Sequence, residues 1–274
     1  LEAAVQSGAD AVYMGFGAFN ARRNAKNFTD EEFADAVAYC HLRGVRVFLT
    51  LNTLLTDREL PGAAAALRKA SAMGVDAVLV QDWGVLTLSQ AVTPDLPIHA
   101  STQMTITGSC GAKILKDMGA SRIVTARELT SDEIRAIYDK VDIEIESFVH
   151  GALSYCYSGQ CLLSSMNGNR SGNRGRCAQS CRLAYDVYNN SKRINNNNQN
   201  YPLSPKDMCA LKVLPDVIDA GVYSLKIEGR MKTALYVATV ARTYRKAIDD
   251  YLENPQKYEE NMDWYRDQIS NCTY

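Results

Sequence analysis

One pattern recurs along this chain and limits the folds open to it: a helical stretch ends in glycine, and a short apolar run follows at once. A glycine just past a helix adopts the left-handed C-cap conformation at no steric cost. The apolar runs are rich in Val, Ile and Leu without alternation, which is typical of parallel strands buried on both faces. The pattern occurs five times, with its glycines at Gly8, Gly44, Gly74, Gly119 and Gly221.

Two further apolar runs lack the glycine but fit the same rhythm, so seven strands are predicted, each followed by helical sequence. They span residues 11–14, 45–49, 77–80, 97–101, 122–124, 141–149 and 222–227. The chain opens on a helix, and one strand upstream of Leu1 would raise the count to eight. Eight βα units predict an α/β fold of the TIM-barrel type. A doubly wound open sheet is the alternative, because strand order is not readable from the sequence.

Two of the predicted helices carry clear start signals. Thr29 and Thr130 each precede acidic residues in the first turn, with Glu32 and Glu133 three positions further on. A hydroxyl followed three residues later by glutamate is the capping-box pattern. We therefore expect helices to begin directly after both threonines.

The rhythm of strands and helices breaks after the sixth strand. Residues 1–150 are predicted to form the first part of the barrel, and residues 203–274 its last unit and the C-terminal helices. Residues 151–202 form an insertion rich in Cys, Gly and Arg between these parts. Within it, the Asn-rich tract at 195–200 is expected to be a loop without a functional role.

The net charge and the hydropathy of the chain argue against some classes of protein. The net charge of −1 argues against a surface that is basic overall, so any contact with nucleic acid needs a local patch. No apolar run approaches the roughly 18 residues of a membrane span. No signal peptide opens the chain, and we expect a cytoplasmic protein.

Four of the eight cysteines crowd into residues 156–181, separated by glycines and arginines. In a cytoplasmic protein such crowding favours metal or redox chemistry over a disulfide framework. Thiolates between tight Gly turns suit an iron–sulfur cluster or a structural zinc, and soft ligands alone do not distinguish the two. The neighbouring Arg174, Arg176 and Arg182 would lower thiol pKa values and offset cluster charge, or bind phosphate.

Polar residues follow the predicted strands at the end where βα barrels build their active sites. Asn52, Ser101 and Gln103 are candidate substrate-binding residues for this reason. Glu146 lies four positions before His150 on the same side of its strand, so the two could form an acid/base or metal-ligand pair.

The last predicted strand ends in Lys226-Ile-Glu228-Gly-Arg230. Alternation places Lys226 and Glu228 on one face, and the glycine lets the backbone approach a ligand. Neither a zinc-protease helix motif nor a serine-nucleophile elbow is present in the sequence, so a hydrolase would lack an identifiable nucleophile.

Together these segments resemble the collagenase-like peptidase family (U32). The resemblance spans nearly the whole chain, and its motifs occur here in the same order. They are Glu146–Ala152, Ser158–Cys161, Gly175–Arg182 and Lys226–Arg230, with further matches at Gly8–Tyr13 and Ser101–Gln103.

The resemblance implies one of two activities. The family name implies a peptidase, whereas its better understood members resemble oxygen-independent hydroxylases of a tRNA or rRNA base or of a quinone precursor. These are implied to use a four-cysteine iron–sulfur cluster and, for RNA, prephenate. Cys161, Cys177 and Cys181 match the family's cluster cysteines. Its first cysteine is Ser154 here, which leaves Cys209, or Cys156 as a substitute, for the fourth ligand.

The leading prediction is therefore an RNA-modifying hydroxylase with a [4Fe–4S] cluster, acting on tRNA or rRNA. The three arginines would face phosphate or a small-molecule carboxylate such as prephenate. Its predicted catalytic residues are Glu146, His150, Lys226, Glu228 and Arg230. The alternatives are a peptidase with Glu146 and His150 around a divalent metal ion, and an RNA- or protein-binding module stapled by zinc.

Overall fold

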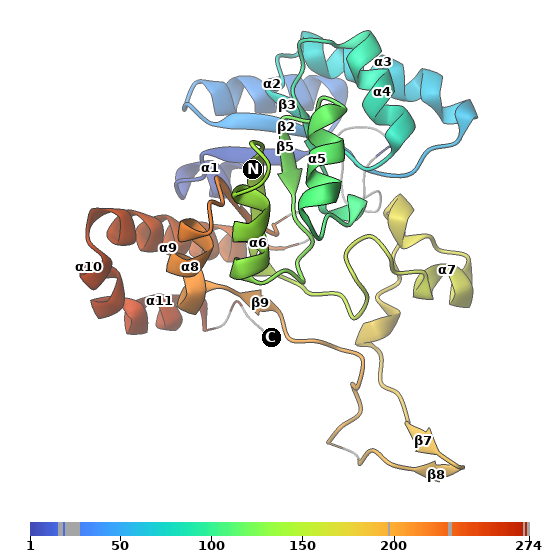
Figure 1. Ribbon diagram of the computed structural model, residues 1–274, viewed down its shortest axis with the longest axis vertical. Helices are drawn as coiled ribbons and strands as arrows, with labels where there is room; N and C mark the ends of the chain where they lie inside the picture. Colours follow the sequence, from blue (N-terminus) through green and yellow to red (C-terminus); the bar gives the residue numbers. More distant parts are fainter. Residues whose placement is uncertain (16–18, 20–27, 197, 230–231, 271, 273–274) are drawn as a thin grey trace.

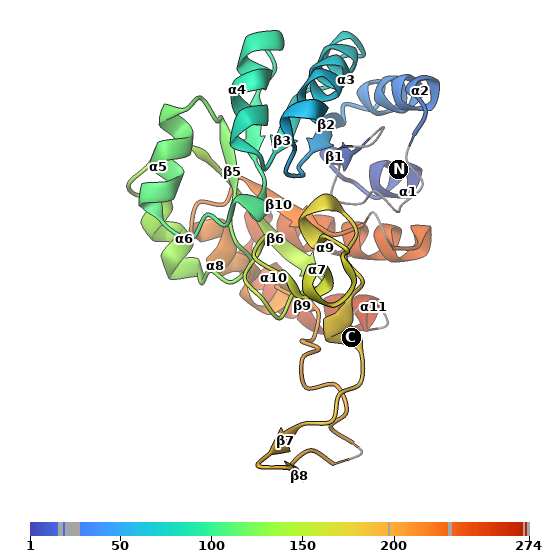
Figure 2. The ribbon, with the colours of Figure 1, turned by 90° about the vertical axis from the view of Figure 1, so that its right-hand side faces the viewer.

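The computed structural model of the chain describes residues 1–15, 19, 28–196, 198–229, 232–270 and 272. Seven parallel strands pair side by side in chain order and form a sheet curled into a half-barrel (Figure 1 and Figure 2). They are β1 (Ala11–Met14), β2 (Arg46–Leu51), β3 (Ala77–Val80), β4 (Ile98–Ala100), β5 (Arg122–Val124), β6 (Glu144–Gly151) and β10 (Ser224–Ile227).

All seven predicted strands are confirmed, with their ends shifted by about three residues at most. A doubly wound sheet would reverse its strand order at a switch point, but here the order is sequential throughout. The doubly wound alternative is therefore wrong. The strand upstream of Leu1 stays a prediction.

The helices are α1 (Glu2–Gln6), α2 (Asp30–His41), α3 (Leu60–Ala72), α4 (Trp83–Val92), α5 (Ser109–Asp117), α6 (Ser131–Tyr138), α7 (Leu163–Gly168), α8 (Leu214–Asp219), α9 (Ala234–Glu253), α10 (Pro255–Glu260) and α11 (Met262–Ile269). Helices α1–α6 flank the sheet on its outer side, and α7 belongs to the cysteine-rich segment. Both predicted capping boxes are present, because Thr29 and Thr130 accept from the backbone N–H of Glu32 and Glu133, whose side chains bond back.

The two edge strands, β1 and β10, face each other across the open side of the half-barrel. The Tyr13 hydroxyl donates to the Ile227 carbonyl at 3.2 Å and links the two edges. On the outside, α1 packs against α9, so the helices also meet there. These contacts hold the curled sheet together across the opening.

The core has three parts, divided by the sheet. The largest lies between the outer face of β1–β6 and helices α1–α6, and the second lies under α8–α11. The third lies inside the curl of the sheet and is small, consisting of Phe48, Ala77, Leu79, Val124 and Phe148. The remaining interior positions carry the polar side chains described below.

The segment between β6 and β10 lies outside the parallel sheet. It contains α7 and the short hairpin β7 (Tyr188–Asn189) and β8 (Lys192–Arg193), which projects from the rest of the molecule (Figure 2). The chain then returns through β9 (Met208–Cys209), which pairs antiparallel with the end of β6. Among the described helices, none is both long and apolar enough to cross a membrane.

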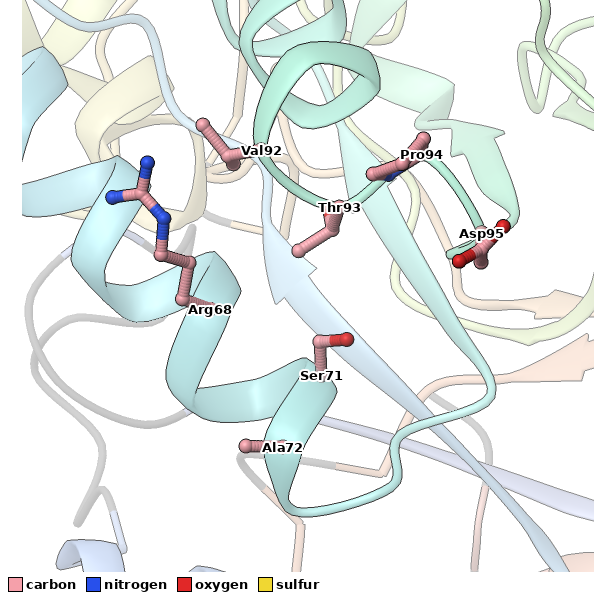
Figure 3. Close-up of a pocket in the computed structure, with 7 residues that line it drawn as sticks. All are labelled: Arg68, Ser71, Ala72, Val92, Thr93, Pro94 and Asp95. Atoms are coloured by element: carbon pink, nitrogen blue, oxygen red, sulfur yellow. The ribbon is translucent and has the colours of Figure 1, made fainter.

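A cavity of about 310 Å³ lies where the C-terminal ends of α3 and α4 meet (Figure 3). These helix ends precede β3 and β4, so the cavity is on the side of the amino ends of the strands. Its lining is Arg68, Ser71, Ala72, Val92, Thr93, Pro94 and Asp95. None of the predicted site residues borders it.

Candidate active site

Glu146 lies inside the half-barrel, where two cations share its carboxylate. Nζ of Lys226 is 2.6 Å from Oε1, and Nη1 of Arg122 is 2.9 Å from Oε2. All three side chains are buried. Burial alone would raise the pKa of Glu146, but Lys226 and Arg122 hold it well below its usual range. The carboxylate is therefore charged, and both of its oxygens are engaged.

Arg122 was not among the predicted site residues, although the sequence carried a signal for it. An arginine that opens a strand buried on both faces needs internal partners. Arg122 finds one in Glu146 and another in Glu144, whose Oε2 lies 2.8 Å from Nη2. Burial, reinforced by the charge of Arg122, lowers the pKa of the adjacent His99 to about 3. The His99 imidazole is thus neutral, with its ring edge-on to Phe48 at 4.8 Å.

His150 faces the other side of the sheet from Glu146. Phe148 pairs with Lys226 and His150 with Ile227, so β6 holds one extra residue, which interrupts the alternation of faces. The buried imidazole packs against Tyr244 and Tyr236 of α9, with Nε2 3.4 Å from the Cys272 carbonyl oxygen. Burial lowers the pKa of His150. The predicted pairing of Glu146 with His150 is therefore corrected.

Amide and hydroxyl side chains gather where β2, β3 and β4 end. Asn52 donates to Oγ of Ser101 at 3.4 Å, and that oxygen accepts from the backbone N–H of Gln103 at 3.3 Å. The predicted group is thus brought together, and Gln81 lies at the end of the intervening strand β3. Within the described part of the chain, Oε1 of Gln81 and Oε1 of Gln103 are buried without a hydrogen-bond partner. Such acceptors are suited to N–H donors of a ligand.

Glu228 joins the ends of β6 and β10. Its Oε2 accepts from the backbone N–H of Ala152 at 3.1 Å and lies 3.9 Å from Nη1 of Arg127. Gly151 has φ of +136°, and a Cβ there would lie 2.5 Å from Cβ of Glu228, so only glycine permits this approach. Lys226 and Glu228 flank the interior as predicted from alternation. Arg230 lies outside the described residues.

The cysteine-rich segment is anchored to the carboxyl ends of β4 and β5 by Ser158 and Gly159. Ser158 donates its backbone N–H to Oε1 of Glu128 at 3.0 Å, and its carbonyl accepts from Thr105 at 2.7 Å. Gly159 lies so close to Gln103 that an added Cβ would be 2.2 Å from its carbonyl oxygen. These contacts bring the thiols that follow to the strand ends.

Cys156 and Cys161 are direct neighbours. Burial raises the pKa of the Cys156 thiol, and so do its hydrogen bond with Cys161 and the charge of Cys181. At Cys156, therefore, the pKa moves in the direction opposite to that predicted from the nearby arginines. The Ser154 hydroxyl accepts from the Cys156 backbone N–H at 3.2 Å and holds this turn. Cys177 lies close by, since Gly172 borders both Cβ of Cys177 and the Cys161 carbonyl.

Cys209 lies on β9, opposite His150 of β6. Its Sγ is 3.9 Å from the Tyr244 hydroxyl, beside His150. All eight cysteines are free thiols. In the described ranges, no three His, Cys, Asp or Glu side chains stand close enough together to hold a metal ion as they are.

Two of the predicted ligand-binding arginines make internal contacts instead. Arg174 forms a two-pronged ion pair with Glu59 and also donates to the Leu54 carbonyl at 2.9 Å. Arg182 donates to Oγ of Ser204 and to the Leu153 carbonyl, both at 2.8 Å. Both guanidinium groups are thus bound within the protein rather than directed at a ligand.

Arg176 remains exposed. Its backbone carbonyl accepts from Nε of Arg170 at 3.2 Å, which secures the turn around it. Of the three predicted arginines, Arg176 is the one whose guanidinium faces solvent beside the cysteines.

Sequence comparisons show the family of this chain. The chain matches peptidase family U32 over residues 1–273. It is 38% identical to tRNA hydroxylation protein P1 of Bacillus subtilis (strain 168), over 99% of this chain and 65% of that protein. It is 44% identical to 23S rRNA 5-hydroxycytidine C2501 synthase of Escherichia coli (strain K12), over 91% of this chain and 38% of that protein.

The chain therefore spans less than two thirds of either relative. Its fold is similar to that of DHDPS from Cyanidioschyzon merolae, with a TM-score of 0.52 and 12% identity over 97% of this chain and 72% of that one. This likeness concerns the barrel-type fold alone. The family match, which runs over nearly every residue, shows that the chain belongs to peptidase family U32.

Proposed function

We propose that this chain is the barrel and cysteine-rich part of an RNA-modifying enzyme that hydroxylates a base of tRNA or rRNA. Two relatives that match most of the chain are named for tRNA hydroxylation and for 5-hydroxycytidine synthesis in 23S rRNA. The observation that carries the proposal is the anchoring of the thiol-bearing segment on the strand ends through Ser158 and Gly159. That edge is where βα barrels hold their substrates.

Cys156, Cys161, Cys177 and Cys181 are the proposed ligands of an iron–sulfur cluster. Soft thiolates suit such a cluster, and these four belong to one short segment. Cys156 is preferred to Cys209 because it contacts Cys161, whereas Cys209 lies beside Tyr244. The thiols need to close in on one another when the cluster is loaded, since their present spacing does not form a metal site. A cluster held there would supply one-electron transfer.

The base to be modified is assigned to the amide-lined strand ends. The buried oxygens of Gln81 and Gln103 would accept hydrogen bonds from its N–H groups, and Asn52 would position Ser101 beside them. A small-molecule carboxylate, prephenate by family resemblance, is assigned to Arg176. Lys226 and Glu146 would supply a fixed, buried charge pair beneath the site rather than a free base.

The peptidase alternative has less support from the geometry. It needs Glu146 and His150 around one metal ion, but Glu146 binds Lys226 and Arg122 while His150 packs on the other side of the sheet. Metal-stimulated cleavage of gelatin by a protease-free preparation would revive it.

The test is the iron, acid-labile sulfide and zinc content of protein purified without oxygen, together with its visible spectrum. We expect about four irons and four sulfides per chain. They should be lost in Cys161→Ser and Cys156→Ser and kept in Cys209→Ser, which is the matched control.

The activity test is mass spectrometry of nucleosides from tRNA and rRNA of cells with and without the protein. Loss of one hydroxylated nucleoside without the protein is the expected result. Protein that contains neither iron nor sulfide would contradict the cluster, and stoichiometric zinc without sulfide would favour the zinc-stapled module.

A further inference from the structure

The β7–β8 hairpin and its flanks, residues 183–206, form an arm that extends away from the sheet (Figure 1 and Figure 2). The two sides of the arm meet at its base, where Tyr185 donates its backbone N–H to the Asn200 carbonyl at 2.7 Å. We call this segment the hairpin arm.

The hairpin arm has a defined shape although it has little core. Asn190 and Ser191 have φ of 48° and 65°, as a two-residue turn of type I′ requires. Asn195 ties the loop together, because its side chain accepts from Val187 N–H at 2.8 Å and donates to the carbonyls of Tyr185 and Gln199. The tract at 195–200 was predicted to be a loop without a functional role, and within it Asn195 fixes the conformation of the arm.

The surface of the hairpin arm carries exposed aromatic and apolar side chains. Tyr188 is 59% exposed, Ile194 60% and Tyr201 62%. A cavity of about 500 Å³ opens beside the last two. Its lining combines apolar groups with amides, namely Val187, Ile194, Asn195, Asn198, Gln199, Tyr201 and Pro202. Flat apolar walls with amide groups at the rim suit an unstacked nucleobase.

The charge of the segment that carries the hairpin arm also favours a nucleic acid as its ligand. Residues 151–209 hold seven Lys and Arg but two Asp and Glu, although the whole chain has a net charge of −1. This part of the chain is therefore positively charged, because it is poor in acidic residues. Lys192 follows the turn directly and is exposed. The next residue, Arg193, lies opposite Tyr188 in the hairpin and forms an ion pair with Asp186 at 2.7 Å. Basic groups interleaved with exposed aromatic rings are typical of single-stranded nucleic-acid binding.

We propose that the hairpin arm binds an unpaired RNA segment of the substrate, with a phosphate near Lys192 and bases against Tyr188 and in the arm's cavity. This inference rests on the proposed function, since it names the surface by which the RNA is held. The arm would bind nucleotides other than the one that enters the strand-end site.

The experiment measures the affinity of the full chain for a fluorescein-labelled tRNA transcript and for labelled oligouridine by fluorescence anisotropy at several salt concentrations. The variants are Lys192→Glu and Tyr188→Ala. Lys140→Glu changes the net charge equally on the exposed turn before β6, and Tyr188→Phe keeps an aromatic ring. Thermal unfolding confirms that each variant is folded.

We expect Lys192→Glu to weaken binding about tenfold and to reduce the salt dependence by about one phosphate contact. Tyr188→Ala should also weaken binding about tenfold, whereas Tyr188→Phe and Lys140→Glu should bind like the wild type. Equal affinities of all variants for an RNA that the wild type binds would overturn the arm proposal alone and leave a protein as its partner. If the wild type binds neither RNA and cellular RNA is unmodified, the proposed function falls and the arm proposal with it.

Discussion

Lys226 and Glu146 form a fully buried ion pair across β10 and β6, with Nζ 2.6 Å from Oε1. Arg122 binds the other carboxylate oxygen at 2.9 Å, so the acid is held between two cations. The second partner of Arg122 is Glu144, whose side chain is 44% exposed, so the ion-pair network runs from the buried interior to the solvent. The Lys226 ammonium also lies 4.5 Å from the centre of the Tyr13 ring.

Removing one member of this pair should be costly. Lys226→Met removes one of the two cations that bind the buried Glu146 carboxylate. Because a buried charge that loses its partner is costly, we expect the free energy of unfolding to fall by about 3–5 kcal/mol. The double variant Glu146→Gln/Lys226→Met should lose less than the sum of the two single variants. Urea unfolding measures all three.

The control for that series is Lys113→Met, since Lys113 pairs with Asp117 at 2.7 Å on the exposed face of α5. Its loss should cost no more than about 1 kcal/mol. Similar losses of unfolding free energy in Lys113→Met and Lys226→Met would show that the buried pair stabilises the fold no more than an exposed pair does.

His99 should make the fold sensitive to mild acid. Its pKa is about 3 in the folded chain, below the usual 6.5 expected when unfolded. As pH falls below about 6.5, the unfolded state takes up a proton that the folded state refuses, so stability falls with pH. We expect the drop in Tm between pH 7 and pH 5 to be smaller in His99→Leu than in the wild type. An unchanged drop would mean that His99 is protonated within the fold.

Gly159→Ala should release the cysteine-rich segment without unfolding the sheet. The added Cβ would meet the Gln103 carbonyl at 2.2 Å, and φ of +79° is itself unfavourable for alanine. We expect faster proteolysis after β6 and lost metal content, with the far-UV circular dichroism unchanged.

Gly168→Ala is the matched control for this substitution, because a Cβ at Gly168 meets nothing within 4 Å. It should digest at the wild-type rate. Equal protection of Gly159→Ala and Gly168→Ala would argue that the anchoring contacts do not hold the segment in place.

His150 should tolerate a large aromatic replacement better than a small one. Its imidazole fills space between Tyr236 and Tyr244, with ring centres 5.8 Å and 5.6 Å away. We expect His150→Ala to lower the free energy of unfolding by about 3–5 kcal/mol, and His150→Phe to cost under about 1.5 kcal/mol. Nucleoside analysis should find RNA hydroxylation retained in His150→Phe. A stable but inactive His150→Phe would instead give the imidazole a chemical role.

The sequence by itself determined the strands, their parallel character and several helix starts. These features are local: a glycine C-cap, an apolar run or a capping box at Thr29 and Thr130 is complete within a few residues. The family resemblance was also readable from the sequence, because its motifs are short and occur in the same order along the chain. Arg122 was not predicted as an interior partner, although a charge within a buried strand could have indicated it.

Only the tertiary structure decided which of these residues meet. One extra residue in β6 turns His150 away from Glu146, because a bulge reverses the face of every later side chain. Arg174 finds its partner Glu59 at a separation of 115 residues, which no local pattern reports. The proposal of Cys156 rather than Cys209 as a cluster ligand likewise depends on how the chain folds back after β6, because the spacing of cysteines in the sequence does not give their distances in space.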